Sequence, residues 1–94
     1  MGARENKVEK YLNAEVENLG GLTRKWVSPG RDGVPDRIVI VLGHVWFVEV
    51  KTVDGPTSSV QVREQGRLMD VGARVATVAG KVEVDEFIKL IKRV

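Results

Sequence analysis

The sequence predicts an α/β domain in which a mixed β-sheet is flanked by helices, in the order α-β-β-β-α-β-α. Two observations support this prediction. Segments near both ends carry apolar residues every three or four positions, and two neighbouring segments in the middle are continuously apolar and rich in β-branched residues. The chain has 94 residues, of which 43% are hydrophobic and 30% charged, as in ordinary globular proteins. We therefore expect residues 1–94 to form one domain with a modest core.

The first element is expected to be an amphipathic helix over residues 4–19. Its apolar positions, spaced by three and four, are Val8, Tyr11, Leu12, Val16 and Leu19. Gly20 and Gly21 end this helix, because glycine suits the backbone conformation of a helix C-terminus. A short strand is expected over residues 22–27, followed by a loop over residues 28–33 that is rich in Gly, Pro, Ser and Asp.

The apolar segments 35–42 and 45–53 are expected to form a β-hairpin. Gly43 and His44 lie between them, and a glycine at the first central position suits a type II′ turn. Both segments carry apolar residues at successive positions, as strands do when both faces of a sheet are covered. Trp26 and Trp46 are expected in the core, since each lies in an apolar strand.

The remaining elements are a helix, a strand and a last helix. Ser58, followed three residues later by Gln61, has the pattern of a capping box and predicts a helix that ends near Val71. Residues 73–78 form the next strand, which should pair in parallel beside the hairpin because a helix connects the two. The last helix is marked by four apolar residues, Val84, Phe87, Ile88 and Ile91.

Composition excludes several kinds of site. The chain has no cysteine, which excludes disulfides, zinc-thiolate centres and cysteine nucleophiles. His44 is the single histidine, so a histidine-rich metal site cannot form, and no Ser-His-Asp triad can be made without this residue. The net charge of +2 permits nucleic-acid binding without requiring it. No apolar run reaches the roughly 18 residues of a membrane span, and we expect no membrane anchor.

Three ionisable residues occupy otherwise apolar strands of the predicted hairpin. If Gly43 and His44 form a two-residue loop, Asp36 lies opposite Lys51, and Glu49 lies diagonal to Asp36. Directly opposed residues point to the same face of a sheet, so the three side chains should cluster at the open end of the hairpin. A register slip by one residue would separate them.

Two interpretations of this cluster remain open from spacing alone. Two carboxylates and the backbone carbonyl of Val50 suit Mg²⁺ or Mn²⁺, which prefer oxygen ligands. The metal would polarise a phosphodiester, while Lys51 held or helped to deprotonate the nucleophile, or neutralised charge in the transition state. Alternatively, Asp36 and Lys51 form a cross-strand ion pair at a solvated sheet end, with Glu49 as a charge at the rim.

Several segments, in the same order along nearly the whole chain, resemble the virus-type replication-repair nuclease (VRR-NUC) family of the PD-(D/E)XK superfamily. They are Arg4-Glu5, Gly20-Gly21, residues 25–30, residues 33–36, residues 45–51 and residues 58–61. The resemblance implies a restriction-endonuclease-like fold and a metal-dependent nuclease. It assigns Asp36, Glu49 and the Val50 carbonyl to Mg²⁺ or Mn²⁺, and Lys51 to catalysis.

The resemblance also implies functions for residues that spacing does not single out. Glu5 falls where the family carries a helix glutamate that completes the site, although a solvated acid in a first helical turn is the alternative. Gln61 matches a family glutamine near the site, and its alternative role is that of capping-box partner. By position, four basic residues are candidates for contacts with DNA phosphates, with solvated surface charge as the alternative for each: Lys25, Arg31, Arg37 and Arg63.

Stand-alone members of the family resemble phage and bacterial proteins and are expected to act as homodimers. A two-fold dimer would present two active sites to two strands, as cutting a four-way (Holliday) junction demands. The resemblance therefore implies a structure-selective DNA endonuclease in DNA repair, cytoplasmic in a bacterial or phage-infected cell. The alternatives are a nuclease of flap or linear DNA, and a DNA-structure-binding module without catalysis.

Overall fold

The computed structural model describes the backbone of residues 3–94 and the side chains of residues 6–94. The elements along the chain are α1 (Ala3–Asn18), β1 (Leu22–Lys25), β2 (Arg37–Val41), β3 (His44–Lys51), α2 (Ser59–Asp70), β4 (Arg74–Ala79) and α3 (Gly80–Arg93). This is the order predicted from the sequence. Across residues 3–94, none of the helices is long and apolar enough to cross a membrane.

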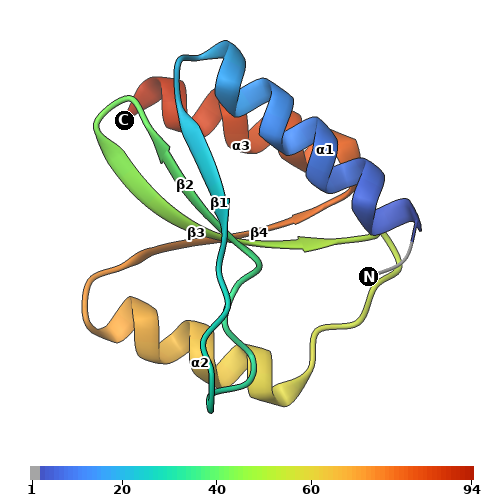
Figure 1. The fold of residues 1–94 in the computed structure, drawn as a ribbon, viewed down its shortest axis with the longest axis vertical. Helices are drawn as coiled ribbons and strands as arrows, with labels where there is room; N and C mark the ends of the chain where they lie inside the picture. The colour runs from blue at the N-terminus through green and yellow to red at the C-terminus, as the bar shows by residue number, and fades with distance from the viewer. Residues whose placement is uncertain (1–2) are drawn as a thin grey trace.

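The four strands form one mixed sheet in the order β1-β2-β3-β4. The first three strands pair antiparallel, whereas β3 and β4 pair in parallel, as predicted for strands connected by a helix. Helices α1 and α3 lie side by side on one side of the sheet, and α2 lies on the other (Figure 1). The α/β class with a mixed sheet flanked by helices is therefore confirmed.

The core lies between the sheet and the pair of helices α1 and α3. Trp46 is buried there, and its ring meets that of Phe87 edge to face with the centroids 5.3 Å apart. The other buried apolar residues are Val8, Leu12, Val16, Val39, Val41, Val48, Val50, Val78, Val84, Ile88 and Ile91. The helical spacing in the sequence thus identified the faces of α1 and α3 that pack on the sheet.

The opposite face of the hairpin is covered only in part, which corrects the expectation that both faces are buried. Ile40 and Val45 are paired across β2 and β3, yet their side chains remain 42% and 46% exposed. Helix α2 makes its sheet contacts mainly with β4. The half of this face nearest the hairpin turn is therefore left to solvent.

The hairpin turn is also one position earlier than predicted, and the register differs by two residues. Val41 pairs with His44, so the loop consists of Leu42 and Gly43, and His44 belongs to β3. Both loop residues have positive φ, 52° and 83°, which is the pattern of a type I′ turn and matches the twist of the strands. Because the shift is an even number, every side chain keeps its predicted face.

Candidate active site

Asp36 lies immediately before β2, where the β2–β3 pairing ends. Its carboxylate accepts a hydrogen bond from the backbone N–H of Val50 at 2.9 Å, and its carbonyl accepts one from the N–H of Trp26 at 2.9 Å. The carboxylate thus replaces the backbone carbonyl that a longer β2 would have offered to β3. Continuing the observed register by one step places Asp36 opposite Glu49, rather than opposite Lys51 as predicted.

Glu49 and Lys51 lie two residues apart on β3 and share one face. Both are largely buried, with 2% and 9% of their surfaces exposed, and Lys51 Nζ lies 3.4 Å from Glu49 Oε2. Val50, between them, points into the core. The structure therefore brings Asp36, Glu49 and Lys51 together at the open end of the hairpin.

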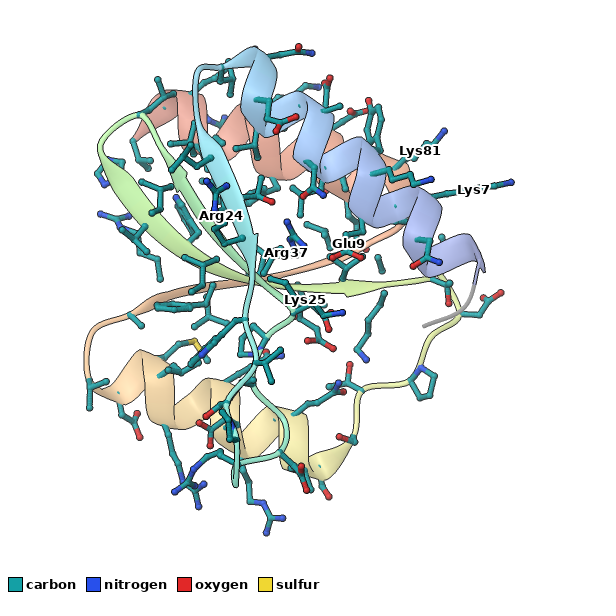
Figure 2. All side chains as sticks on the ribbon, in the orientation of Figure 1. Lys7, Glu9, Arg24, Lys25, Arg37 and Lys81 are labelled. Carbon is teal, nitrogen blue, oxygen red and sulfur yellow. The ribbon has the colours of Figure 1, made fainter. Side chains whose placement is uncertain are left out.

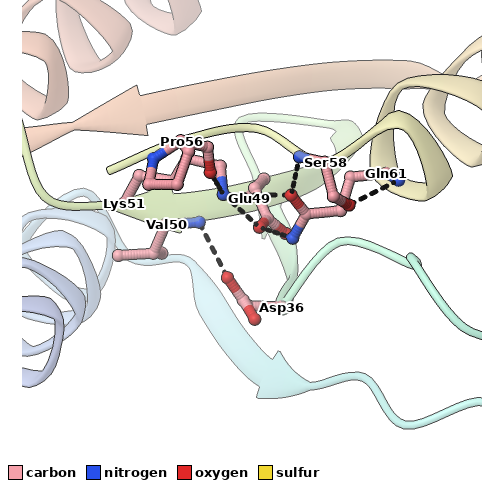
Figure 3. A network of polar contacts seen from close by, with 7 residues as sticks. All are labelled: Asp36, Glu49, Val50, Lys51, Pro56, Ser58 and Gln61. Carbon is pink, nitrogen blue, oxygen red and sulfur yellow. Dashed lines mark hydrogen bonds and ion pairs between the residues drawn. The ribbon is translucent and has the colours of Figure 1, made fainter. Parts of the chain in front are cut away.

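Gln61 connects these side chains to the start of α2 (Figure 3). Its backbone N–H donates to Ser58 Oγ at 3.1 Å, and its side-chain Oε1 accepts from the Ser58 N–H at 3.0 Å, which confirms the capping box. The same Oε1 accepts from Lys51 Nζ at 3.0 Å, and Nε2 donates to Glu49 Oε2 at 2.7 Å. The two roles considered for Gln61 are thus compatible in one geometry.

Negative charge exceeds positive charge in this cluster. Burial, together with the nearby charge of Asp36, raises the pKa of Glu49 to about 7, although Lys51 acts in the opposite direction. Glu49 Oε1 is buried and has no hydrogen-bond partner among the described residues. A cation would supply that missing partner and offset the repulsion between the two carboxylates.

The donor set fits a hard divalent cation. Carboxylate and carbonyl oxygens are the ligands that Mg²⁺ and Mn²⁺ favour, and Lys51 completes the polar surroundings. Among the described side chains, no group of three acidic, histidine or cysteine residues meets at one point. Glu5, which the family resemblance assigns to the site, has a side chain that lies outside the described residues.

Arg37 takes part in a different cluster, on the α1 side of the sheet (Figure 2). Its guanidinium donates to Glu9 Oε2 at 3.0 Å and to Thr23 Oγ1, and Thr23 in turn donates to Asn13 Oδ1 at 2.7 Å. Arg37 and Glu9 side chains are only 13% and 14% exposed. Glu9 was not predicted as a site residue, although it lies four positions after Glu5 in the sequence.

The other basic residues differ in their surroundings. Arg31 lies 3.6 Å from the buried carboxylate of Glu64, which also pairs with Arg67 at 3.2 Å, so the loop before the site is held against α2. Lys25 and Arg63 are exposed, and neither forms a salt bridge with another described residue. Of the four residues predicted to contact phosphates, Arg31 and Arg37 therefore form ion pairs within the protein. Lys25 and Arg63 form none with the described residues.

A mixed sheet that carries an aspartate at the mouth of one strand and Glu-X-Lys on the next is the arrangement typical of nucleases of the PD-(D/E)XK class. No family model matches the chain. Over 73 residues the chain is 45% identical to "Putative nuclease p44" of Acyrthosiphon pisum secondary endosymbiont phage 1, covering 77% of this chain and 78% of that protein.

A solved structure described as "VRR_NUC domain" is similar over 94% of this chain and 97% of its own, with a TM-score of 0.87 and 40% identity. The chain belongs to the VRR-NUC family of nucleases. The resemblance and fold inferred from the sequence are confirmed by these similarities.

Proposed function

We propose that this nuclease is a structure-selective DNA endonuclease that depends on Mg²⁺ or Mn²⁺ and hydrolyses phosphodiester bonds. The observation that carries the proposal is the pair of carboxylates, Asp36 and Glu49, beside Lys51. One oxygen of Glu49 is buried without a partner among the described residues. If the cluster were only an ion pair that stabilised the sheet end, one carboxylate would neutralise Lys51. A second, partly buried carboxylate would then cost free energy without a partner.

Asp36, Glu49 and the carbonyl of Val50 are proposed to hold the metal. When bound, the ion would polarise the phosphodiester and lower the pKa of a coordinated water. Lys51 supplies a positive charge within 3.4 Å of Glu49, where it can hold the nucleophile or stabilise charge that develops on the phosphate. Gln61 holds both side chains in place through its amide.

Glu5 is proposed as the third acid of the metal site, on the basis of the family resemblance. For DNA contact, Lys25 and Arg63 are exposed and suited to phosphate oxygens, and the side chain of Arg31 is 54% exposed despite its pairing with Glu64. Arg37 would reach a phosphate only by leaving Glu9. Its proposed contribution is therefore to hold α1 against the strand that follows Asp36.

We further propose a homodimer that acts on four-way junctions. Three apolar residues, Leu22, Ile40 and Val45, lie in one row across β1, β2 and β3, and each is between 42% and 48% exposed. Leu42, at the adjacent turn, is 51% exposed. A second copy of this chain seated on the row would bury it, while the acidic cluster at the opposite end of each hairpin stayed accessible to DNA.

Cleavage of labelled DNA tests the proposed activity. The wild-type protein is incubated with a four-way junction, a flap and a linear duplex of matched sequence, with Mg²⁺, Mn²⁺ or EDTA. We expect metal-dependent cleavage with the junction cut fastest, and no cleavage by Asp36→Ala or Lys51→Ala. Cleavage of flap or linear DNA at the same rate would reject junction selectivity. Binding without cleavage in either metal would instead favour a non-catalytic DNA-binding module.

Mass in solution tests the dimer. Light scattering of wild type is expected to give twice the chain mass, and Ile40→Lys should give the monomer, because a charge in the centre of the row would be buried. Leu90→Lys is the matched control, since Leu90 is a 40% exposed apolar residue on α3. A dimer that persists in Ile40→Lys, or is lost in Leu90→Lys, would place the interface elsewhere.

A further inference from the structure

We infer that Ser58 is a positioning residue, whose hydroxyl fixes Gln61 and through it the side chains of Lys51 and Glu49. Ser58 precedes α2, is exposed, and forms no hydrogen bond with the described side chains of Glu49 and Lys51. Its influence on the site therefore passes through the capping box. The catalytic part of this inference rests on the proposed function, whereas its structural part does not.

The capping box holds Gln61 at two points. Ser58 Oγ accepts from the backbone N–H of Gln61 at 3.1 Å, which sets the position of its Cα in the first helical turn. The backbone N–H of Ser58 donates to the side-chain Oε1 of Gln61 at 3.0 Å. Ser58 thus holds both the backbone and the side chain of Gln61, independently of the contacts that Gln61 makes with Lys51 and Glu49.

This arrangement also selects the orientation of the glutamine amide. The Ser58 N–H and the Lys51 ammonium are both donors, so both require the amide oxygen. The amide nitrogen then faces Glu49 Oε2, at 2.7 Å, which requires a donor. If the amide were flipped, its nitrogen would face two other donors and its oxygen would face a carboxylate. The orientation that completes the capping box is therefore also the one that allows hydrogen bonds with Lys51 and Glu49.

The start of α2 has few other constraints. Residues 57–60 are exposed, and α2 contacts the sheet mainly at β4. Contacts that also hold this region include the hydrogen bond from Lys51 Nζ to the carbonyl of Pro56, at 2.8 Å, and the close approach of Val60 to Gly33. Loss of the Ser58 hydroxyl would therefore loosen the turn that carries Gln61, because it removes the acceptor for a backbone N–H of the first helical turn.

Three variants and one matched control test the inference. Ser58→Ala and Ser58→Gly both remove the hydroxyl, but an N-cap tolerates glycine better than alanine, so Ser58→Gly separates the positioning of Gln61 from the stability of the helix. Ser58→Thr retains an acceptor oxygen and should restore the wild-type behaviour. Ser59→Ala removes a neighbouring exposed hydroxyl that makes no hydrogen bond in the described structure and should change nothing.

Two measurements are made on each variant. Steady-state cleavage of a junction should show kcat lower by roughly 10-fold in Ser58→Ala and Ser58→Gly with KM for DNA unchanged, as for residues that orient groups at a metal site. The side-chain amide resonances of Gln61 in ¹⁵N NMR spectra should move in both variants toward the values of a free glutamine, because the amide contacts with Lys51 and Glu49 become less well aligned.

Each outcome decides one claim. Wild-type kcat in Ser58→Gly, with the Gln61 amide resonances unmoved, would overturn the inference and leave Ser58 as a helix cap alone. If wild type cleaves no DNA, the proposed activity fails, yet the amide resonances still decide whether Ser58 positions Gln61. Movement of these resonances without a change in kcat would reject the catalytic part only.

Discussion

Asp36 and Arg37 are neighbours in sequence, but their side chains belong to two polar clusters on opposite sides of the sheet. The two clusters differ in their ratio of acidic to basic side chains. In the Arg37 cluster, one arginine faces one glutamate, and Thr23 and Asn13 extend the hydrogen bonds to α1. The Asp36 cluster contains two carboxylates and one lysine, and the lysine pairs with Glu49. One oxygen of Glu49 lacks a partner among the described residues, and the pKa of Glu49 is raised to about 7.

We interpret this difference as that between a structural cluster and the proposed active site. A matched ion pair that joins a helix to a sheet stabilises the fold, even though the Nε of Arg37 also lacks a described partner. Excess buried charge of one sign opposes folding and persists where a ligand or a reaction requires it. Substitutions in the first cluster should therefore change stability, and substitutions in the second should change activity.

The largest effect is expected from Glu49→Gln. This change keeps the shape of the side chain but removes a proposed metal ligand, so kcat for DNA cleavage should fall on the order of 1,000-fold. The free energy of unfolding at pH 8 should not fall, because the substitution removes a buried carboxylate from beside Asp36. Cleavage assays and urea unfolding measure the two quantities on the same preparation.

A loss of stability in Glu49→Gln would contradict this comparison, since it would assign a structural role to the unbalanced cluster. Glu64→Gln is a suitable control, because Glu64 is another largely buried glutamate that pairs with Arg31 and Arg67. It should lower stability modestly and leave cleavage by the folded protein close to wild type.

The next largest effect is expected from Arg37→Met in the balanced cluster. Removal of the guanidinium leaves Glu9 partly buried without its partner, which should lower the free energy of unfolding by about 3 kcal/mol. The double variant Glu9→Gln, Arg37→Met should recover part of this loss. Denaturant unfolding of the single and double variants measures the coupling, and strictly additive effects would show that the pair does not stabilise the fold.

The sequence predicted the elements and the shared face of the three ionisable residues because both depend on periodicity. Alternation along β3 places Glu49 and Lys51 together regardless of the register, and an even shift leaves Asp36 on the expected face. The turn itself was predicted wrongly because Leu42 adopts a positive φ, which nothing in its side chain favours. Tertiary pairing of the strands decided that position.

The Glu9 to Arg37 contact could not be predicted from local pattern. The two residues are 28 positions apart, and their contact depends on the angle at which α1 crosses the sheet. Gln61 is the opposite case, since its capping-box partner is three residues away and visible in the sequence. Its further contacts with β3 depend on the path of the loop between Lys51 and Ser58, which local sequence pattern does not predict.

A smaller effect is expected from substitution of Glu5 or Glu9 in α1. The two variants test which of these acids belongs to the proposed metal site and which to the Arg37 cluster. Glu5→Gln should lower kcat by roughly 10- to 100-fold without changing the melting temperature, if Glu5 completes the metal site as proposed. Glu9→Gln should lower the melting temperature and leave kcat of the folded protein near wild type. The reverse result, loss of kcat in Glu9→Gln at unchanged melting temperature, would make Glu9 the third acid.

The smallest effect is expected from pH, acting through Glu49. Its pKa is raised from an ordinary 4.5 to about 7 in the folded protein, so the folded state binds this proton more tightly than the unfolded chain does. The resulting stability is complete below pH 4.5 and is lost as the pH rises through about 7. Metal-free protein should therefore melt at a lower temperature at pH 8 than at pH 6.

Metal binding should reverse this trend, because a carboxylate must lose its proton before it can bind a cation. At pH 6, about one unit below the raised pKa, the apparent affinity for Mn²⁺ should be roughly tenfold weaker than at pH 8, or about 1.4 kcal/mol. The rise in melting temperature caused by Mn²⁺ should then be larger at pH 8 by several degrees. Equal rises at both pH values in wild type, or a pH-dependent rise that persists in Glu49→Gln, would show that Glu49 does not govern metal binding.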